Sequence, residues 1–525
     1  MSWFDNVNPL SPQNKLNRAV ARQKLGQLDK ITNSGYSRNG ASKNKKSLMG
    51  WISKGASPDE DIVDNLQTLR DRSRDLYMGT PLATGALKTI RTNVIGSGLK
   101  LNSRIDYEYL GLSQEQAEEW EKSVEREWKL WAQTKECDAA RMQNFGQIQS
   151  LVLLSALMSG DVFAVLPVIE RKGSTYDLRI SLIEGDRVCD PTTKPKLAEG
   201  YKLSGGIVQD EYSAPVGYYV MQGHPGSKKA LSAKSKYIPA FGADTGRPNV
   251  IHIFNELERP GQSRAVPILS PVIESLKQLG RYTEAELMAA VVSGMFTVFI
   301  KSETPDSPLN SVIPEEEQVD AEDDSSYELG NGAIIGLGEN EAVETANPGR
   351  PNTAFDGFVT SVCRQIGAGL EIPYELLVKH FTASYSASRG ALLEAWKMFK
   401  MRRTWMVDGF CQPVYEEWLA EAVAKGRVNA PGFFDDPVVR AAWCGTEWYG
   451  PTQGQLDPLK EANAAKVRIN EELSTRTREA SESTGEDWDR LHKQRTREEN
   501  KRRDDNTIMD PELITATKPE GEQNA

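Results

Sequence analysis

The sequence Arg259-Pro260-Gly261-Gln262-Ser263-Arg264 opens a run of helical periodicity that extends from Ala265 to about Ile300. Apolar side chains recur there at intervals of three and four, which predicts an amphipathic helix; they are Leu269, Val272, Leu276, Leu279, Leu287 and Val291. The intervening positions are polar and include Lys277, Arg281 and Glu284. About 25 helical residues would span roughly 37 Å, which suits a strut better than an ordinary globular helix.

The segment that follows, residues 302–345, is strongly acidic: it holds thirteen carboxylates and no Lys or Arg. Its densest part comprises Glu315, Glu316, Glu317, Asp320, Glu322, Asp323 and Asp324. These side chains could bind divalent cations, but they lack the Asp-x-Asp-x-Asp-Gly pattern of a calcium loop. A solvated acidic surface is the favoured interpretation, and no metal or other cofactor is predicted.

Composition indicates an extended or multi-part subunit. The 525 residues suffice for about two to four domains, while 39 % hydrophobic residues and a mean hydropathy of −0.51 imply much solvated surface. No apolar run is long enough to span a membrane, and the first residues lack the core of a signal peptide. The five cysteines form no CxxC pair, so neither a disulfide framework nor a zinc site is predicted, and synthesis in a reducing cytosol is expected.

The net charge of −11 is unevenly distributed. Residues 1–50 carry nine Lys or Arg against two Asp, so residues 1–58 are predicted to form a basic, mobile arm. The arm either contacts nucleic acid or another shell component, or is simply a solvated tail. Because the rest of the chain shows no broad basic footprint, tight DNA binding is disfavoured as its main activity.

Helices and then strands are predicted before the strut. A first helical pattern covers 59–93 and is interrupted at Pro81. A second helix is predicted to begin at a cap formed by Ser113 and Gln116, and a third covers 145–158. The capped helix carries an aromatic stripe, which indicates core or a subunit interface rather than a ligand cage; its members are Trp120, Val124, Trp128 and Trp131. A β-rich piece at 161–255 includes a hairpin, 161–169 and 176–183, and short strands at 206–209, 216–221 and 250–254.

After the acidic segment, helices are predicted again. One covers about 352–369, and a loop then leads to a long helix beginning near Ser386. The apolar face of this long helix holds Leu392, Trp396, Phe399, Met406 and Phe410, and its other side holds Lys397, Lys400, Arg402 and Arg403. Pro413 should kink it before it ends at Gly426. Residues 457–503 are predicted to be helical and densely charged.

No catalytic motif is present in the sequence. The phosphate-binding GxxxxGK[ST], the nucleophile elbow GxSxG and the zinc-binding HExxH are all missing. None of the four histidines lies at metal-ligand spacing from another His or Cys. The sequence therefore gives no support for an enzyme.

Six separated segments make the chain resemble the lambda-type portal proteins of tailed bacteriophages. They are Gly79-Thr-Pro-Leu-Ala-Thr-Gly-Ala86 with Asn93-Val-Ile-Gly-Ser-Gly-Leu99, Ile183-Glu-Gly-Asp-Arg-Val188, Arg259-Pro-Gly-Gln262 through Pro267, Arg281-Tyr-Thr-Glu-Ala-Glu-Leu287, Ser384-Tyr-Ser-Ala-Ser-Arg389 with Leu392-Leu-Glu394, and Asp457-Pro-Leu-Lys-Glu461. Together they cover most of residues 70–470 in the family's order. No single segment is diagnostic, but together and in this order they indicate the resemblance strongly.

The resemblance implies a mainly helical α+β subunit that assembles into a dodecameric ring. The implied regions are an N-terminal arm (1–58), a wing (59–258), a stem helix (259–300), an acidic clip (301–347), a second stem helix (348–370), a tunnel loop (371–386), a kinked helix with a return to the wing (387–450), and a crown with the C-terminal tail (451–525). The implied subunit has no enzymatic activity and uses no cofactor.

The resemblance also implies partners and sites. Double-stranded DNA would pass through the ring, and the terminase large subunit, capsid and scaffolding proteins, and head-completion or tail adaptor proteins would dock on it. The assembly would form in the bacterial host cytoplasm and remain in the virion, without a membrane. Residues expected at the tunnel are Lys379, His380, Tyr385 and Arg389, those of the stem are Lys277, Arg281 and Glu284, and those facing the terminase are the clip carboxylates Glu315, Glu316, Glu317, Asp320, Asp323 and Asp324.

The dimensions of such a ring agree with DNA passage. Twelve helices packed about 10 Å apart enclose an opening of about 28 Å once one helix width is subtracted, which admits a duplex roughly 20 Å wide. An acidic lumen would repel phosphates, with a sparse cationic ring at Lys379, His380 and Arg389. Alternatively, Lys379 and Arg389 merely pair with Glu375 or Glu394. Two other classes stay open, a shell or scaffold protein without a channel and a metal-dependent DNA-processing enzyme.

Overall fold

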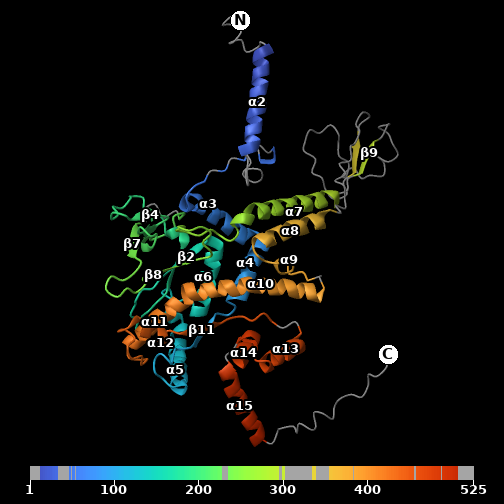
Figure 1. Cartoon of the computed structure of the whole chain (residues 1–525). Helices are drawn as coiled ribbons and strands as arrows, with labels where there is room; N and C mark the ends of the chain where they lie inside the picture. The colour runs from blue at the N-terminus through green and yellow to red at the C-terminus, as the bar shows by residue number, and fades with distance from the viewer. Residues whose placement is uncertain are drawn as a thin grey trace, which may run out of the picture. The chain divides into compact units, whose positions relative to one another are not determined.

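A computed structural model describes most of the chain (Figure 1). The described residues are 12–32, 46–48, 50, 51, 53, 55–227, 234–294, 298–301, 334–337, 354–381, 384–454, 457–485 and 488–505. The chain divides into two compact units, Met1–Ser57 and Pro58–Ala525. The first unit contains helix α2 (Pro12–Thr32) and a 3₁₀ turn, Lys46–Leu48.

The second unit is mainly helical, as the sequence predicts. Its helices are α3 (Pro58–Gly79), α4 (Pro81–Val94), α5 (Gln114–Ala132), α6 (Phe145–Ser159), α7 (Ile273–Gly294), α8 (Phe355–Gly369), α9 (Tyr374–Leu377), α10 (Tyr385–Met406), α11 (Gln412–Ala424), α12 (Pro437–Trp443), α13 (Pro458–Asn470), α14 (Arg476–Thr484) and α15 (Trp488–Asp504). The predicted break at Pro81 is confirmed. Residues 457–503 form three separate helices.

The strands form small sheets. In one sheet, β2 (Asp161–Val165) lies between β3 (Ser181–Glu184) and β8 (Val250–Phe254), antiparallel to both. The meander β4–β5–β6–β7 comprises Lys202–Ser204, Ile207–Gln209, Pro215–Met221 and Ser235–Pro239. Two further pairs are the antiparallel β1 (Lys100–Ser103) with β11 (Thr446–Tyr449) and the parallel β9 (Val298–Lys301) with β10 (Ile334–Leu337). The hairpin and the three predicted short strands are confirmed, whereas the sequence does not predict β1, β4, β7, β9, β10 or β11.

Local sequence signals explain where two of the core helices begin and end. Ser113 and Gln116 form the predicted capping box of α5, in which each side chain accepts from the backbone N–H of the other residue. Asn144 and Gln147 form a second box at α6. Helix α6 ends at Gly160, whose φ of 90° suits a residue without Cβ.

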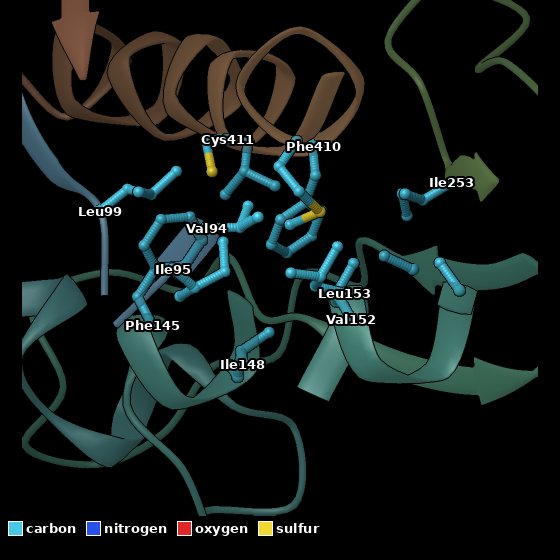
Figure 2. Close-up of a cluster of buried hydrophobic side chains, with 14 of the residues drawn as sticks. Val94, Ile95, Leu99, Phe145, Ile148, Val152, Leu153, Ile253, Phe410 and Cys411 are labelled. Atoms are coloured by element: carbon cyan, nitrogen blue, oxygen red, sulfur yellow. The ribbon is translucent and has the colours of Figure 1, made fainter. Parts of the chain in front are cut away.

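The main core lies where α4, α6 and the α10–α11 helix meet. Figure 2 shows Val94 and Ile95 packed with Val152 and Leu153 of α6 and with Phe410. Next to this cluster, Trp128 lies 5.1 Å from both Trp131 and Trp418, measured between ring centroids. Val124, Trp128 and Trp131 are buried, which confirms that the predicted aromatic stripe belongs to the core.

The long C-terminal helix is interrupted close to the predicted kink. A π-helical segment, Val407–Cys411, separates α10 from α11, and Pro413 stands in the first turn of α11. Because proline has no N–H to donate, the backbone there cannot complete the ordinary helical ladder. Gly426, with φ 67°, follows the end of α11 as predicted.

Helix α7 is shorter than the sequence predicts. It begins at Ile273 rather than Ala265 and ends at Gly294, and residues 298–301 form a strand instead. Pro267 and Pro271 account for the late start, since neither can donate a helical hydrogen bond. None of the helices in the described ranges has the length and hydropathy that a bilayer crossing requires.

Candidate functional site: a buried ion cluster and the helices it anchors

Asp161, the first residue of β2, is the centre of a buried ion cluster. Its side chain is fully buried, and Arg264 meets it with two hydrogen bonds, Nε to Oδ2 at 2.6 Å and Nη2 to Oδ1 at 2.9 Å. Arg70 of α3 donates from Nη2 to Oδ1 at 2.6 Å. His252 of β8 places its Nε2 3.4 Å from Oδ2. One carboxylate therefore joins α3, β2, β8 and the segment that leads to α7.

The charges within this cluster determine its protonation state. Burial alone would raise the pKa of Asp161, but the guanidinium groups of Arg264 and Arg70 outweigh it and hold that pKa well below the usual range. Burial lowers the pKa of Arg70 to about 10 and lowers the pKa of His252 below its ordinary value. The carboxylate thus stays ionised and paired, as a buried charge must.

Arg264 also fastens three turns of the β-rich piece. Its guanidinium donates to the carbonyl oxygens of Val188 at 2.6 Å, Gly205 at 2.5 Å and Gly185 at 2.7 Å. A Cβ at Gly185 would lie 2.3 Å from Asp161 Oδ1, so only glycine fits there. The Ile183–Val188 and Arg259–Pro267 segments, which are 70 residues apart in sequence, therefore meet at this carboxylate.

A second acidic side chain of the same turn, Asp186, is held by Arg74. The two form an ion pair in which Arg74 Nη1 lies 3.1 Å from Oδ1, and Gln67 Nε2 donates to the same oxygen at 3.3 Å. Burial acts to raise the pKa of Asp186, but the hydrogen bond from Arg74 and the positive charges of Arg70 and Arg74 together outweigh it, so the pKa is lowered. Helix α3 is thus fixed to the β-rich piece by two buried carboxylates.

The segment from Arg259 to α7 is fixed along its whole length. Arg259 pairs with Asp61, and Ser263 donates from its N–H and Oγ to Asp59 Oδ1 at 2.9 and 2.7 Å. Ile268 N–H donates to the Leu157 carbonyl at 2.9 Å. These contacts connect the segment that leads into α7 to α3 and α6.

Helices α7 and α8 lie side by side (Figure 1), and their two ends differ in burial. At the end of the pair that packs on the main core, Leu276 and Leu279 of α7 and Ile366 of α8 are buried. Farther along, Tyr282 packs on the rings of Phe355 and Phe358 at 5.7 and 4.8 Å. Beyond Tyr282, α7 exposes the apolar side chains of Leu287, Met288 and Val291. Phe358 of α8 is also half exposed.

The predicted stem residues all lie on the surface of α7. Lys277, Arg281 and Glu284 are exposed. Lys277 Nζ lies 3.9 Å from Asp75 Oδ2, and both side chains are largely in solvent, so this ion pair contributes little to stability. The structure brings these three residues together on one helix but gives them no buried partner among the described residues.

The predicted tunnel-loop residues are divided between the end of the turn that follows α9 and the first part of α10. Lys379 and His380 are exposed, Lys379 has a φ of 56°, and His380 N–H donates to the Glu375 carbonyl at 3.0 Å. Arg389 lies on α10 with its Nη2 3.9 Å from Glu461 Oε1. Tyr385 begins α10.

The alternative pairing of these cations with Glu375 or Glu394 is not what the described residues show. Glu394 instead pairs with Lys397 at 2.7 Å, on the same helix. In the ranges that the structure covers, Lys379 makes no ion pair. The predicted clip carboxylates, Glu315 to Asp324, lie outside the described residues.

Two arginines of α10 are placed differently from the sequence prediction, which assigned them to the polar face. Arg402 is buried, donating to Asn255 Oδ1 at 2.5 Å and lying 3.4 Å from Glu371 Oε2. Arg403 donates to the backbone carbonyls of Asn93, Val94 and Pro451, and its burial lowers its pKa to about 10. Both bind groups distant in sequence, which a helical period does not reveal.

This arrangement is structural rather than catalytic. Both oxygens of Asp161 are saturated by donors, so no oxygen is free for a substrate or a metal. Within the described ranges, no group of three or more His, Cys, Asp or Glu is placed to hold a metal ion. Sequence reasoning missed Asp161 and Arg264 as partners. The available signal was a carboxylate opening an otherwise apolar strand.

Comparison with known proteins places the chain among phage proteins. The family model described as "Phage portal protein, lambda family" matches residues 44–403. The chain is 25 % identical over 476 residues to portal protein B of Escherichia phage lambda, covering 87 % of this chain and 88 % of that protein. It is equally similar to the portal protein of Escherichia phage N15, with 25 % identity over 476 residues and the same coverage of both proteins.

Solved structures match more weakly. A chain from the virion of a native gene transfer agent particle is 11 % identical, with a TM-score of 0.37 over 73 % of this chain and 93 % of that chain. A chain from the neck of the native particle, computed with C12 symmetry, is 12 % identical, with a TM-score of 0.37 over 78 % of this chain and 92 % of that chain.

Proposed function

Because the chain belongs to the lambda family of phage portal proteins, we propose that twelve copies form a ring at one capsid vertex, through which double-stranded DNA is packaged and later ejected. Portal proteins are structural components of the virion and not enzymes. In this proposal a terminase motor supplies the work of packaging, and the ring later serves as the platform for head-completion and tail adaptor proteins. Capsid and scaffolding proteins contact its outer side.

The α7–α8 pair is the observation that supports a ring. At one end of the pair Leu276, Leu279 and Ile366 are buried, whereas toward the other end Leu287, Met288, Val291 and Phe358 are exposed. Contiguous exposed apolar side chains on paired helices are suited to burial against neighbouring copies. Twelve such helices set about 10 Å apart would surround an opening of about 28 Å, wide enough for a duplex.

The elements of the second unit correspond to the regions of a portal subunit in this proposal. The wing contains α3 to β8, the stem contains α7 and α8, the tunnel loop covers 371–386, the kinked helix and wing return cover 387–450, and the crown contains α13 to α15. The acidic segment 301–347 is assigned to the clip. Its thirteen carboxylates would attract a basic surface of the motor.

Imaging of the full-length protein tests the ring. Size-exclusion chromatography with light scattering gives the mass of the assembly, and negative-stain microscopy shows whether it has a central hole. We expect a ring whose bore is about 28 Å. A monomer, a sheet-like assembly or a solid centre would overturn the proposal, and the last two would favour a shell protein.

The cationic loop is proposed to contact the passing DNA. Lys379 and His380 are exposed, and Arg389 is 42 % exposed with one distant carboxylate partner. Particles carrying Lys379→Ala and Arg389→Ala together should assemble but retain less full-length genome, because fewer cations then oppose slippage of the phosphate backbone. Normal packaging and retention in these particles would remove the loop from this role.

The clip proposal has its own test. Replacing Glu315, Glu316 and Glu317 with Gln removes three negative charges per subunit. Binding of the terminase large subunit should weaken and lose part of its salt dependence, since rim charges act mainly on association. An unchanged affinity that does not respond to salt would contradict the assignment.

A further inference from the structure

A groove between α5 and α15 is a feature that the channel does not use. It encloses about 1040 Å³, with β1 and the first residues of α6 also contributing to its walls. None of its lining residues belongs to α7, α8 or residues 370–384. The groove is therefore separate from the elements assigned to the channel.

Two stripes of cations face this groove. Helix α5 contributes Lys122, Arg126 and Lys129, and α15 contributes Arg490, Lys493 and Arg497. The spacings are i, i+4, i+7 and i, i+3, i+7, so each set occupies one face of its helix. All six side chains are exposed. Because α15 buries none of its residues, its packing alone does not explain its position against α5.

Positive charge exceeds negative charge in the groove. Its lining holds eight Lys or Arg against four Asp or Glu, a net charge of +4. Two of the four carboxylates accept hydrogen bonds from backbone N–H groups in and just after β1. Glu125 accepts from Ser103 N–H at 3.4 Å, and Glu121 accepts from Ile105 N–H at 3.0 Å. These bonds leave both carboxylates charged, and Glu125 also lies 3.6 Å from Lys129 Nζ, so the lining keeps its net charge of +4.

Where α5 and α15 approach each other, the ammonium groups of Lys122 and Lys493 lie near one carboxylate. Lys122 Nζ lies 2.9 Å and Lys493 Nζ 3.9 Å from Glu118 Oε2. Four further cations of the lining make no ion pair within the described part of the chain; they are Lys100, Arg126, Arg490 and Arg497. Like charges held this close repel one another, so an additional anion would stabilise the two helices in this arrangement.

We propose that this groove binds the phosphate backbone of duplex DNA at a site outside the channel. The three cations of α15 span about 10 Å along the helix, close to three nucleotide rises of 3.4 Å. The exposed side chains of the lining are charged or polar rather than aromatic or aliphatic, which is typical of nucleic-acid interfaces and not of the cores of protein interfaces. The inference goes beyond the proposed channel and does not require it.

Binding of a short labelled duplex to the full-length protein tests this site. The variant Arg490→Ala/Lys493→Ala/Arg497→Ala removes the α15 stripe. The matched control Arg495→Ala/Arg502→Ala/Arg503→Ala removes the same charge from the other side of α15, where no residue lines the groove. Fluorescence anisotropy is measured between 50 and 200 mM salt.

The groove variant should bind at least about tenfold more weakly at low salt, and its log–log salt slope should fall by about 2 to 3, because each released phosphate contact contributes about 0.9. The control should keep the parent slope. Equal losses in both variants, or no loss in either, would overturn the proposal. So would groove-dependent binding of a peptide of residues 302–345 without duplex binding, since the groove would then be a protein contact.

The same preparations separate this inference from the channel. Negative-stain images of the groove variant should show the same assembly as the parent protein, because no lining residue lies on α7 or α8. Loss of duplex binding without any ring in the parent would contradict the proposed function and support the groove. A ring that packages DNA but shows no groove-dependent binding would support the proposed function and contradict the groove.

Discussion

The cluster around Asp161 and the outer half of α7–α8 are close in sequence but opposite in character. In the cluster, both oxygens of Asp161 have donors, and Arg264 is 1 % exposed. On α7, little more than twenty residues later, Leu287 is 65 % exposed and Met288 57 %. Polar contacts of defined geometry thus fix the segment that leads into α7, while the second half of the helix exposes apolar side chains.

The largest effect is expected from Arg264→Ala. The substitution leaves Asp161 with less positive charge around it and removes the donor from three buried carbonyl oxygens. Removing one partner of a buried ion pair typically costs about 3–5 kcal/mol of unfolding free energy. Denaturant unfolding followed by tryptophan fluorescence, at matched protein concentration, measures it.

Arg281→Ala is the matched control for Arg264→Ala, since it removes an exposed arginine from α7, the helix that follows the Arg264 segment. It should change the unfolding free energy by no more than about 0.5 kcal/mol. Arg264→Lys keeps the charge but not the planar set of donors, so its loss should fall between the two. If Arg264→Ala costs less than about 1 kcal/mol, the cluster is not what fixes α7.

How far the sequence anticipates these two regions follows from how local their signals are. The period of α7 is visible in consecutive residues, so the helix is predicted even though Pro267 and Pro271 shorten it. The Asp161 cluster joins residues 91 and 103 positions apart, and no period records such a pairing. Arg402 was assigned to solvent for the same reason, because its partner Asn255 is 147 residues away.

The predicted site residues also differ in how much of their environment the sequence reveals. Lys277, Arg281 and Glu284 are exposed on α7 because charged side chains on an amphipathic helix face away from its buried stripe. The pairing of Arg389 with Glu461 joins α10 to α13 and could not be read from the sequence, where Glu375 and Glu394 were the alternative partners considered. Contacts along one helix are predictable, and contacts between helices require the fold.

A smaller effect is expected within the α7–α8 pair from Tyr282→Ala. The ring lies 4.8 Å from Phe358 and 5.7 Å from Phe355, and such aromatic pairs contribute about 1 kcal/mol beyond the area that they bury. The substitution should lower the protection of α7 and α8 amides in hydrogen exchange by about fivefold, since opening of this pair is a local event. Tyr282→Phe keeps both ring contacts and should retain most of the protection. Unchanged protection in Tyr282→Ala would mean that the pair is held together elsewhere.

The smallest effect on the subunit itself is expected from Leu287→Ser/Met288→Ser. Both side chains are mostly in solvent, so removing them should change the unfolding free energy of the separated subunit by no more than about 0.5 kcal/mol. If neighbouring copies bury these side chains, the same substitutions should shift the assembly toward smaller species in size-exclusion chromatography with light scattering, because each buried large apolar side chain contributes about 1.5–3 kcal/mol. Arg281→Ser/Glu284→Ser, on the same helix and neutral in net charge, should leave the assembly intact. A Leu287→Ser/Met288→Ser protein with an unchanged assembly would show that the exposed face of α7 is not a contact between subunits, and the contrast with the Asp161 cluster would then need another cause.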